Sequence, residues 1–126
     1  VDSLGRPSRI RRPLTSRHTQ LSIIARKIDS DVNYEMLEVI PRLKAGAVIH
    51  WHDITIPTNY WQDWVQHGKI FWNESFMVHT FMLFNDAFRV LWGARYMGLS
   101  HFEELRARFP YLTPQHRLMS FWIQRN

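Results

Sequence analysis

The segment 45-AGAVIHWHDITIP-57 decides which fold the sequence predicts. Its first half is short, rich in β-branched residues and apolar on both faces, which is typical of a strand buried inside an α/β sheet. Gly46 supplies the turn that leads into this strand, and Pro57 closes the segment. We therefore predict a strand over residues 47–54, with two histidines and an aspartate near its end.

Helices and strands are expected to alternate on both sides of this strand. Ser30 or Asp31 can cap the start of a helix with apolar residues at helical spacing, and Pro41 should bend or end it, because its ring clashes with the preceding turn. The elements expected downstream are a buried helix at 73–85, a strand at 88–94, a short helix at 100–109 with a Ser100–Glu103 capping box, and a strand at 118–124. This order implies an α/β layered domain whose last two strands pair antiparallel at one sheet edge.

The positive charge of the chain is concentrated at its start. The 126 residues carry a formal charge of +5, yet residues 1–28 hold seven basic and one acidic side chain, so the rest is nearly neutral. All 18 aromatic residues follow residue 28, so the basic segment has none on which bases could stack. We expect residues 1–24 to be an unstructured arm and residues 25–126 to be the folded part, and we do not expect nucleic-acid binding.

Several classes of protein are excluded or disfavoured by composition. The chain has no cysteine, which excludes disulfides, thiolate metal ligands and a cysteine nucleophile, and it has no G-x-S-x-G sequence for a serine nucleophile. No apolar run reaches the roughly 18–20 residues that span a bilayer. The expected class is a cytoplasmic protein of one domain that does not enter the membrane.

Three stretches of the folded part resemble class I S-adenosylmethionine-dependent methyltransferases. They are DVNYEMLEVIPRLKAGAVIHWHDITIP (31–57), FWNESFMVHTFMLFNDAFRVLW (71–92) and SFWIQR (120–125). They are most similar to the branch with H-x-H-D at a strand end, which is associated with sugar and natural-product biosynthesis. The resemblance implies that residues 31–54 are the fourth helix and fifth strand of a seven-stranded Rossmann-like sheet. The last two strands would be its antiparallel terminal hairpin.

The resemblance is confined to the C-terminal half of that family. The family binds S-adenosylmethionine through a Gly-rich loop after strand one and an acidic residue after strand two, but the five glycines here never form G-x-G. Where the family has an Asp-Ser-Ser-His-like end of strand four, this chain reads RHTQLSII (17–24). The expectation is a truncated methyltransferase preceded by foreign sequence, without measurable cofactor binding. Its strand at 47–54 would offer a free edge for self-association, unless LSIIARKI (21–28) covers it.

The histidines of HWHD admit three interpretations. A zinc site on His50 and His52 would need a third ligand from elsewhere in the chain. In the methyltransferase interpretation, His52 is the general base for a substrate hydroxyl, and Asp53 orients it or binds a Mg²⁺ that acidifies the hydroxyl. In the third, the histidines only form hydrogen bonds within a buried strand. Alternation along the strand places both histidines on one face and Asp53 on the other.

Further candidate residues follow the strand. Asn73 and Glu74 either begin a helix, as cap and early carboxylate, or hold the hydroxyls of a small-molecule acceptor or a metal. The aromatic side chains before them, Trp61, Trp64 and Trp72, either close over a flat or sugar-like acceptor or attach their loop to the domain. A function from another class remains open, a non-catalytic interaction module that uses the aromatic loop or the free sheet edge.

Overall fold

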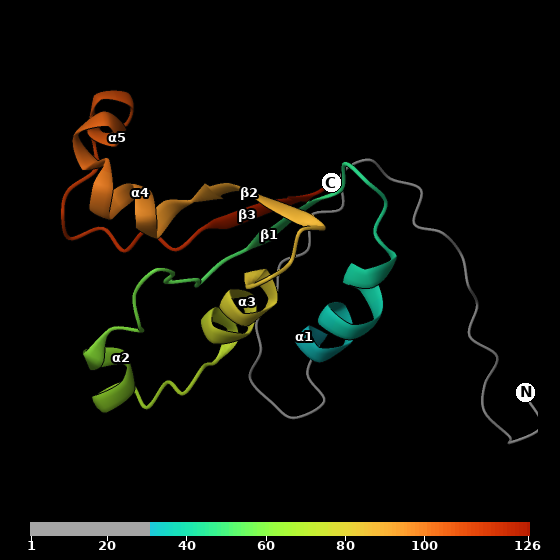
Figure 1. The fold of residues 1–126 in the computed structure, drawn as a ribbon. Helices are drawn as coiled ribbons and strands as arrows, with labels where there is room; N and C mark the ends of the chain where they lie inside the picture. The colour runs from blue at the N-terminus through green and yellow to red at the C-terminus, as the bar shows by residue number, and fades with distance from the viewer. Residues whose placement is uncertain (1–30) are drawn as a thin grey trace, which may run out of the picture.

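Helices and strands alternate along residues 31–126, the part of the chain that the computed structural model describes (Figure 1). The elements are α1 (Asp31–Tyr34), π-helical η1 (Glu35–Val39), 3₁₀-helical η2 (Ile40–Arg42), β1 (Val48–Trp51), α2 (Gln62–Gln66), α3 (Glu74–Met82), β2 (Phe88–Gly93), α4 (Ala94–Ser100), α5 (Phe102–Arg108) and β3 (Phe121–Arg125). The mixed α/β composition is as predicted, with one additional helix, α4. The basic arm and LSIIARKI lie outside the described residues.

The three strands form one sheet in the order β1-β3-β2, and β3 runs antiparallel to both neighbours. The antiparallel pairing of the last two strands is confirmed, although β3 lies in the middle of the described sheet and not at its edge. Because β3 is antiparallel to both, β1 and β2 run in the same direction. Their carboxyl ends therefore share one end of the sheet, where Trp51 and Gly93 both pair with Phe121.

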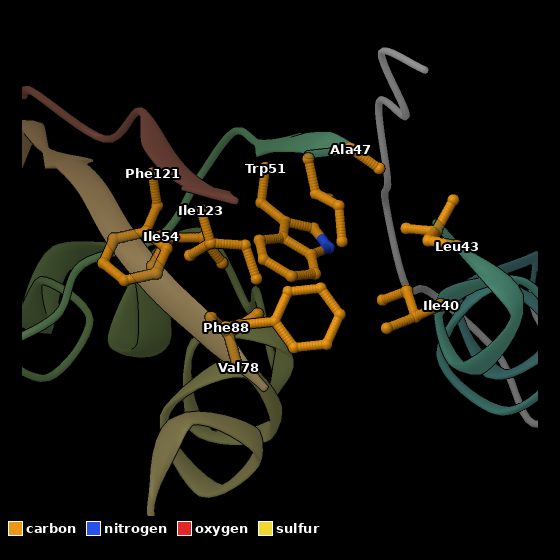
Figure 2. Close-up of a cluster of buried hydrophobic side chains, with 10 residues drawn as sticks. Ile40, Leu43, Ala47, Trp51, Ile54, Val78, Phe88, Phe121 and Ile123 are labelled. Atoms are coloured by element: carbon orange, nitrogen blue, oxygen red, sulfur yellow. The ribbon is translucent and has the colours of Figure 1, made fainter. Parts of the chain in front are cut away.

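One face of the sheet carries the core. Side chains from β1, β2 and β3 converge there with side chains from η2 and α3 (Figure 2). The members are Ile40, Leu43, Ala47, Ile49, Trp51, Ile54, Val78, Phe88, Phe121 and Ile123. Figure 1 shows α1 and α3 together on this side of the sheet. Burial of these side chains is the main stabilising term of the described fold.

The other face of β1 is only partly covered, which corrects the prediction of a strand buried on both faces. Ile49 and Trp51 are buried, whereas Val48 and His50 between them are half-buried. His50 stacks on Trp122 of β3 with ring centroids 4.1 Å apart. The sequence is apolar on both faces, but α1 and α3 lie on one side of the sheet, and the side chains of Val48 and His50 on the other face of β1 stay half-buried.

The first helix ends as its proline requires. The regular α1 turn gives way to π-helical η1 and then to η2, which contains Pro41. A proline ring removes one N–H donor and crowds the preceding turn, so the regular hydrogen-bond ladder cannot continue through it. Leu43 then has extended backbone angles.

Gly46 connects this helical segment to β1. The Ala47 N–H donates to the Lys44 carbonyl, and Gly46 has φ +85°, which together describe a type II turn. The Gly46 N–H also donates to the Arg125 carbonyl, while the Arg125 N–H donates to the Ala47 carbonyl. This is the pattern of a G1 bulge, whose first residue needs a left-handed conformation. Gly46 thus sets the register at which β1 joins β3.

We predict that Gly46→Ala lowers the free energy of unfolding by about 1–2 kcal/mol, because this is the conformational strain of a residue with a Cβ in the left-handed region. The loss is strain alone, since an added Cβ would have no atom within 4 Å. Urea unfolding followed by circular dichroism measures it. Gly46→Asn is the control and should lose less, because asparagine tolerates positive φ. Equal losses for both variants would contradict the strain argument.

Two helices differ from their predictions. α3 is not buried all round, because only Glu74, Ser75 and Val78 are buried and Phe76 is 51% exposed. The Ser100–Glu103 capping box is wrong, since Ser100 is the last residue of α4 and His101 occupies the N-cap of α5. A separate helix before α5 places the serine inside regular structure, where it cannot cap the next helix.

Candidate active site

His52 and Asp53 leave β1 together at its carboxyl end. β1 ends at Trp51, and Asp53 has φ +59°, a left-handed conformation that aspartate tolerates better than most residues. The strand alternation therefore stops before these two residues, and the expectation that they face opposite sides of the sheet is wrong. The imidazole Nδ1 of His52 instead lies 2.9 Å from Oδ2 of Asp53.

This contact fixes the tautomer of His52. An ionised carboxylate only accepts hydrogen bonds, so Nδ1 carries the proton, and in the neutral ring Nε2 keeps its lone pair. The side chains of His52 and Asp53 are 30% and 27% exposed, and Nε2 has no hydrogen-bond partner within the described residues. Nε2 is therefore placed to accept a proton from a ligand that approaches the end of β1.

His50 belongs to a different environment. Its Nε2 lies 2.7 Å from Ser120 Oγ, and its Nδ1 is buried without a partner among the residues described. Burial, with a smaller contribution from the nearby charge of His52, lowers the pKa of His50 below its usual value of 6.5. Burial thus favours the neutral form of His50 in the sheet, which fits a structural role.

We predict that the depressed pKa of His50 makes the fold less stable in acid. In the unfolded chain this histidine takes up a proton near pH 6.5, but the folded state resists it, so stability falls as the pH drops below that value. Urea midpoints at pH 7.5 and pH 5 measure the difference, and His50→Gln should reduce it. His67→Gln, at an exposed site, should leave it as in the wild type. An unchanged difference in His50→Gln would contradict the assignment.

A buried polar network fixes the loop that follows Asp53. The Thr55 N–H donates to Ser75 Oγ at 2.8 Å, and the Ser75 N–H donates to the Tyr60 hydroxyl at 3.0 Å. Thr55 also exchanges hydrogen bonds with Thr58 at 2.9 Å. These contacts tie the segment after Asp53 to the N-terminus of α3. The sequence signals a loop here, but not that its hydroxyls bond one another.

Glu74 is a buried carboxylate without a hydrogen bond. It is 5% exposed, and neither of its oxygens has a partner within residues 31–126. Burial chiefly raises the pKa of Tyr60 to about 12, and the charges of Glu74 and Asp53 add to the increase. The two carboxylates and the phenol therefore share one electrostatic environment. Asn73 precedes them at the N-cap of α3, although its side chain makes no capping hydrogen bond.

The three candidate tryptophans lie together. Trp64 is central, with ring centroids 5.3 Å from Trp61 and 5.4 Å from Trp72, and Tyr60 stacks on it at 6.2 Å. The guanidinium of Arg117 lies over Trp61 and Trp64, at 4.8 and 5.7 Å from the ring centroids. This aromatic cluster, Tyr60, Trp61, Trp64 and Trp72, is mutually packed and half-buried. It attaches the loop to the domain and leaves part of its surface available to a ligand.

Neither implied cofactor is accommodated by the described residues alone. No three His, Asp, Glu or Cys side chains of residues 31–126 lie close enough together to hold a metal ion. The Asp53 carboxylate is already engaged with His52. For S-adenosylmethionine, none of β1, β2 or β3 is followed by a G-x-G loop. What the described residues offer at this end of β1 is the ring nitrogen Nε2 of His52, which has no hydrogen-bond partner among them.

Comparisons with protein families, with curated proteins and with solved structures find no match to this chain. Among the described residues, no helix combines the length and apolar character needed to cross a membrane.

Proposed function

We propose that this chain carries the acceptor side of an S-adenosylmethionine-dependent O-methyltransferase, with His52 as the general base for the hydroxyl of a small molecule. The observation that carries the proposal is the contact of His52 Nδ1 with Asp53 Oδ2 at the carboxyl end of β1. Ligands of open α/β sheets bind at the carboxyl ends of the strands. The antiparallel pairing of β2 and β3 is compatible with the terminal hairpin that the resemblance implies.

The residues of this chain would act on the acceptor in a defined order. The acceptor hydroxyl donates a hydrogen bond to His52 Nε2, and its proton moves to that nitrogen as the oxygen becomes nucleophilic. Asp53 keeps the imidazole in the required tautomer and stabilises the imidazolium that forms. The exposed surface of the aromatic cluster offers a flat apolar contact for the acceptor, and the exposed Asn73 offers a polar one. Glu74, the other predicted contact, is only 5% exposed and is not available at the surface.

A reconstitution assay tests the proposal. The chain is mixed with the Gly-rich donor half of a class I methyltransferase, methyl-labelled S-adenosylmethionine and a panel of sugar and phenolic hydroxyl compounds. Labelled product is expected only with both polypeptides, because the donor must be held in line with the acceptor oxygen. Calorimetry of the chain alone with the cofactor should show no saturable heat. Saturable cofactor binding by the chain alone would contradict the assignment of an acceptor side without a donor side.

Variants of the dyad make the assay specific. His52→Asn should lower the rate by about 10²–10⁴-fold, the usual contribution of a general base. Asp53→Asn should also lower it, because an amide can leave His52 in the wrong tautomer. His67→Asn, at an exposed site that is not part of the dyad, should retain the rate. Retention of full rate in His52→Asn would exclude His52 as the base.

The free edge of β1 favours a second candidate function, a non-catalytic interaction module. Within residues 31–126, β1 pairs with β3 only. The Ala47 carbonyl accepts a hydrogen bond from the Arg125 N–H of β3. In an antiparallel pair, successive residues point their N–H and C=O groups alternately toward the partner strand and away from it. The backbone groups of Val48 and His50 therefore point away from β3, toward the free edge of β1. Such an edge can add a strand from a second chain. Sedimentation of the whole chain and of a chain lacking residues 1–28 tests this, and self-association that appears only after the deletion would support a covering role for that segment.

A further inference from the structure

We propose that a cavity between α4 and the segment 114–118 binds a small carboxylate with an apolar body. The cavity has a volume of about 340 Å³. Its lining combines a cationic side chain, an imidazole and apolar walls: Arg95, Gly98, Leu99, Phe102, Pro114, His116 and Leu118. This volume lies within the range of small-molecule sites, which join apolar walls with a few polar groups. The site is separate from the dyad and does not depend on the proposed methyl transfer.

Arg95 is held in place by contacts that do not neutralise it. Its Nε donates to Thr58 Oγ1 at 3.3 Å, and its guanidinium carbon lies 5.0 Å from the ring centroid of Trp61. No carboxylate of the described residues pairs with it, and its two terminal nitrogens have no hydrogen-bond partner there. A guanidinium with two free terminal nitrogens matches the two oxygens of a carboxylate.

Arg117 provides the contrast. It stacks on the same ring, 4.8 Å from the Trp61 centroid, but its Nη2 lies 2.7 Å from Asp63 Oδ2. That hydrogen bond lowers the pKa of the Asp63 carboxyl. The charge of Arg117 is therefore paired and Arg117 does not line the cavity, whereas Arg95 lines it and has no paired carboxylate within residues 31–126.

His116 supplies a second donor. Its Nδ1 lies 2.9 Å from the backbone nitrogen of Thr113, which can only donate, so Nδ1 must accept. The proton of the neutral ring is therefore on Nε2, which has no partner among the described residues. Arg95 and His116, which both have unpartnered donors, thus line one cavity, and no acidic side chain of residues 31–126 lines it with them.

The apolar walls of the cavity indicate that the rest of the ligand is apolar. Leu99, Phe102, Pro114 and Leu118 present no polar side-chain atom to the cavity. α4 approaches the wall closely at Gly98, where an added Cβ would lie 3.0 Å from Leu118 Cδ1. A small inorganic anion would leave these walls in contact with water, whereas an aromatic or branched aliphatic carboxylate would cover them.

Titration of the whole chain with sodium benzoate, benzamide and sodium phosphate, followed by calorimetry and amide NMR shifts, tests the proposal. Benzoate should bind saturably in the millimolar range, and benzamide, which has the shape without the charge, should bind at least about tenfold more weakly. Phosphate, which has the charge without the apolar body, should also bind more weakly. Equal affinity for benzoate and benzamide, or no saturable benzoate binding, would overturn the proposal.

Variants distinguish binding of benzoate in the cavity from nonspecific binding to the basic surface of the chain. Arg95→Gln should weaken benzoate binding by at least about tenfold, and Arg117→Gln should change it by less than about twofold. Leu99→Trp, at a half-exposed position, should fill the cavity and abolish binding while the amide spectrum shows a folded chain. An equal loss in Arg95→Gln and Arg117→Gln, or full binding in Leu99→Trp, would show that benzoate binds elsewhere.

Discussion

Replacing Glu74 by methionine is expected to raise the free energy of unfolding by about 1–3 kcal/mol. This carboxylate is 5% exposed and neither oxygen has a hydrogen-bond partner within residues 31–126. A buried polar group without a partner costs about 1–3 kcal/mol, and a charged one costs more. Methionine has a similar length and fills the same space without that cost. Urea unfolding of both proteins at one pH measures the change.

Glu103→Met is the matched control, because Glu103 also lies in the first turn of a helix but is exposed. Both substitutions remove a negative charge from a helix N-terminus, which costs about 0.3–1 kcal/mol. Only Glu74→Met also removes a buried carboxylate. A loss of stability in both variants would mean that Glu74 is satisfied in the folded chain. A gain in Glu74→Met alone would show that the wild-type residue is kept at a cost to stability, as functional residues often are.

The sheet could be predicted because its signals are local. The apolar run before HWHD and the final SFWIQ stretch each contain several consecutive strand-forming residues, and they became β1 and β3. Gly46 likewise marks its turn, since only glycine adopts φ +85° without strain. The coverage of the faces could not be predicted. Apolar residues on both faces of β1, or around α3, show what can be buried, but the neighbouring elements decide what is buried.

The candidate site, too, could be predicted only in part. The sequence places His52 and Asp53 at a strand end, but strand alternation puts them on opposite faces. Their contact depends on the strand ending at Trp51 and on the positive φ of Asp53, and no residue pattern specifies either feature. The position of Arg95 could not be predicted from composition. This arginine is one of 16 basic residues in the sequence, and only the fold shows which of the described ones lines a cavity without a paired carboxylate.

Trp51→Ala is expected to lower the free energy of unfolding by about 3–5 kcal/mol, the range for removing a large buried aromatic side chain. Trp51 is 1% exposed, and its ring makes an edge contact with Phe81, with centroids 6.4 Å apart. It lies in the core that joins the sheet to η2 and α3 (Figure 2). The total free energy of unfolding of a small domain is about 5–15 kcal/mol, so this loss is a large part of it. Thermal unfolding followed by circular dichroism measures it.

Trp51→Phe keeps the prediction testable if the alanine variant does not fold. Phenylalanine leaves a smaller cavity and also removes the indole N–H, which is buried without a partner in the described residues. The two effects oppose each other, so the loss should be well under half of that for alanine. Trp92→Ala, on the less covered face, should lower the free energy of unfolding by about 1 kcal/mol, because folding buries less of the apolar surface of Trp92. If Trp92→Ala destabilised the fold as much as Trp51→Ala, the two faces of the sheet would be equally buried, and the partly open face described for β1 would be wrong.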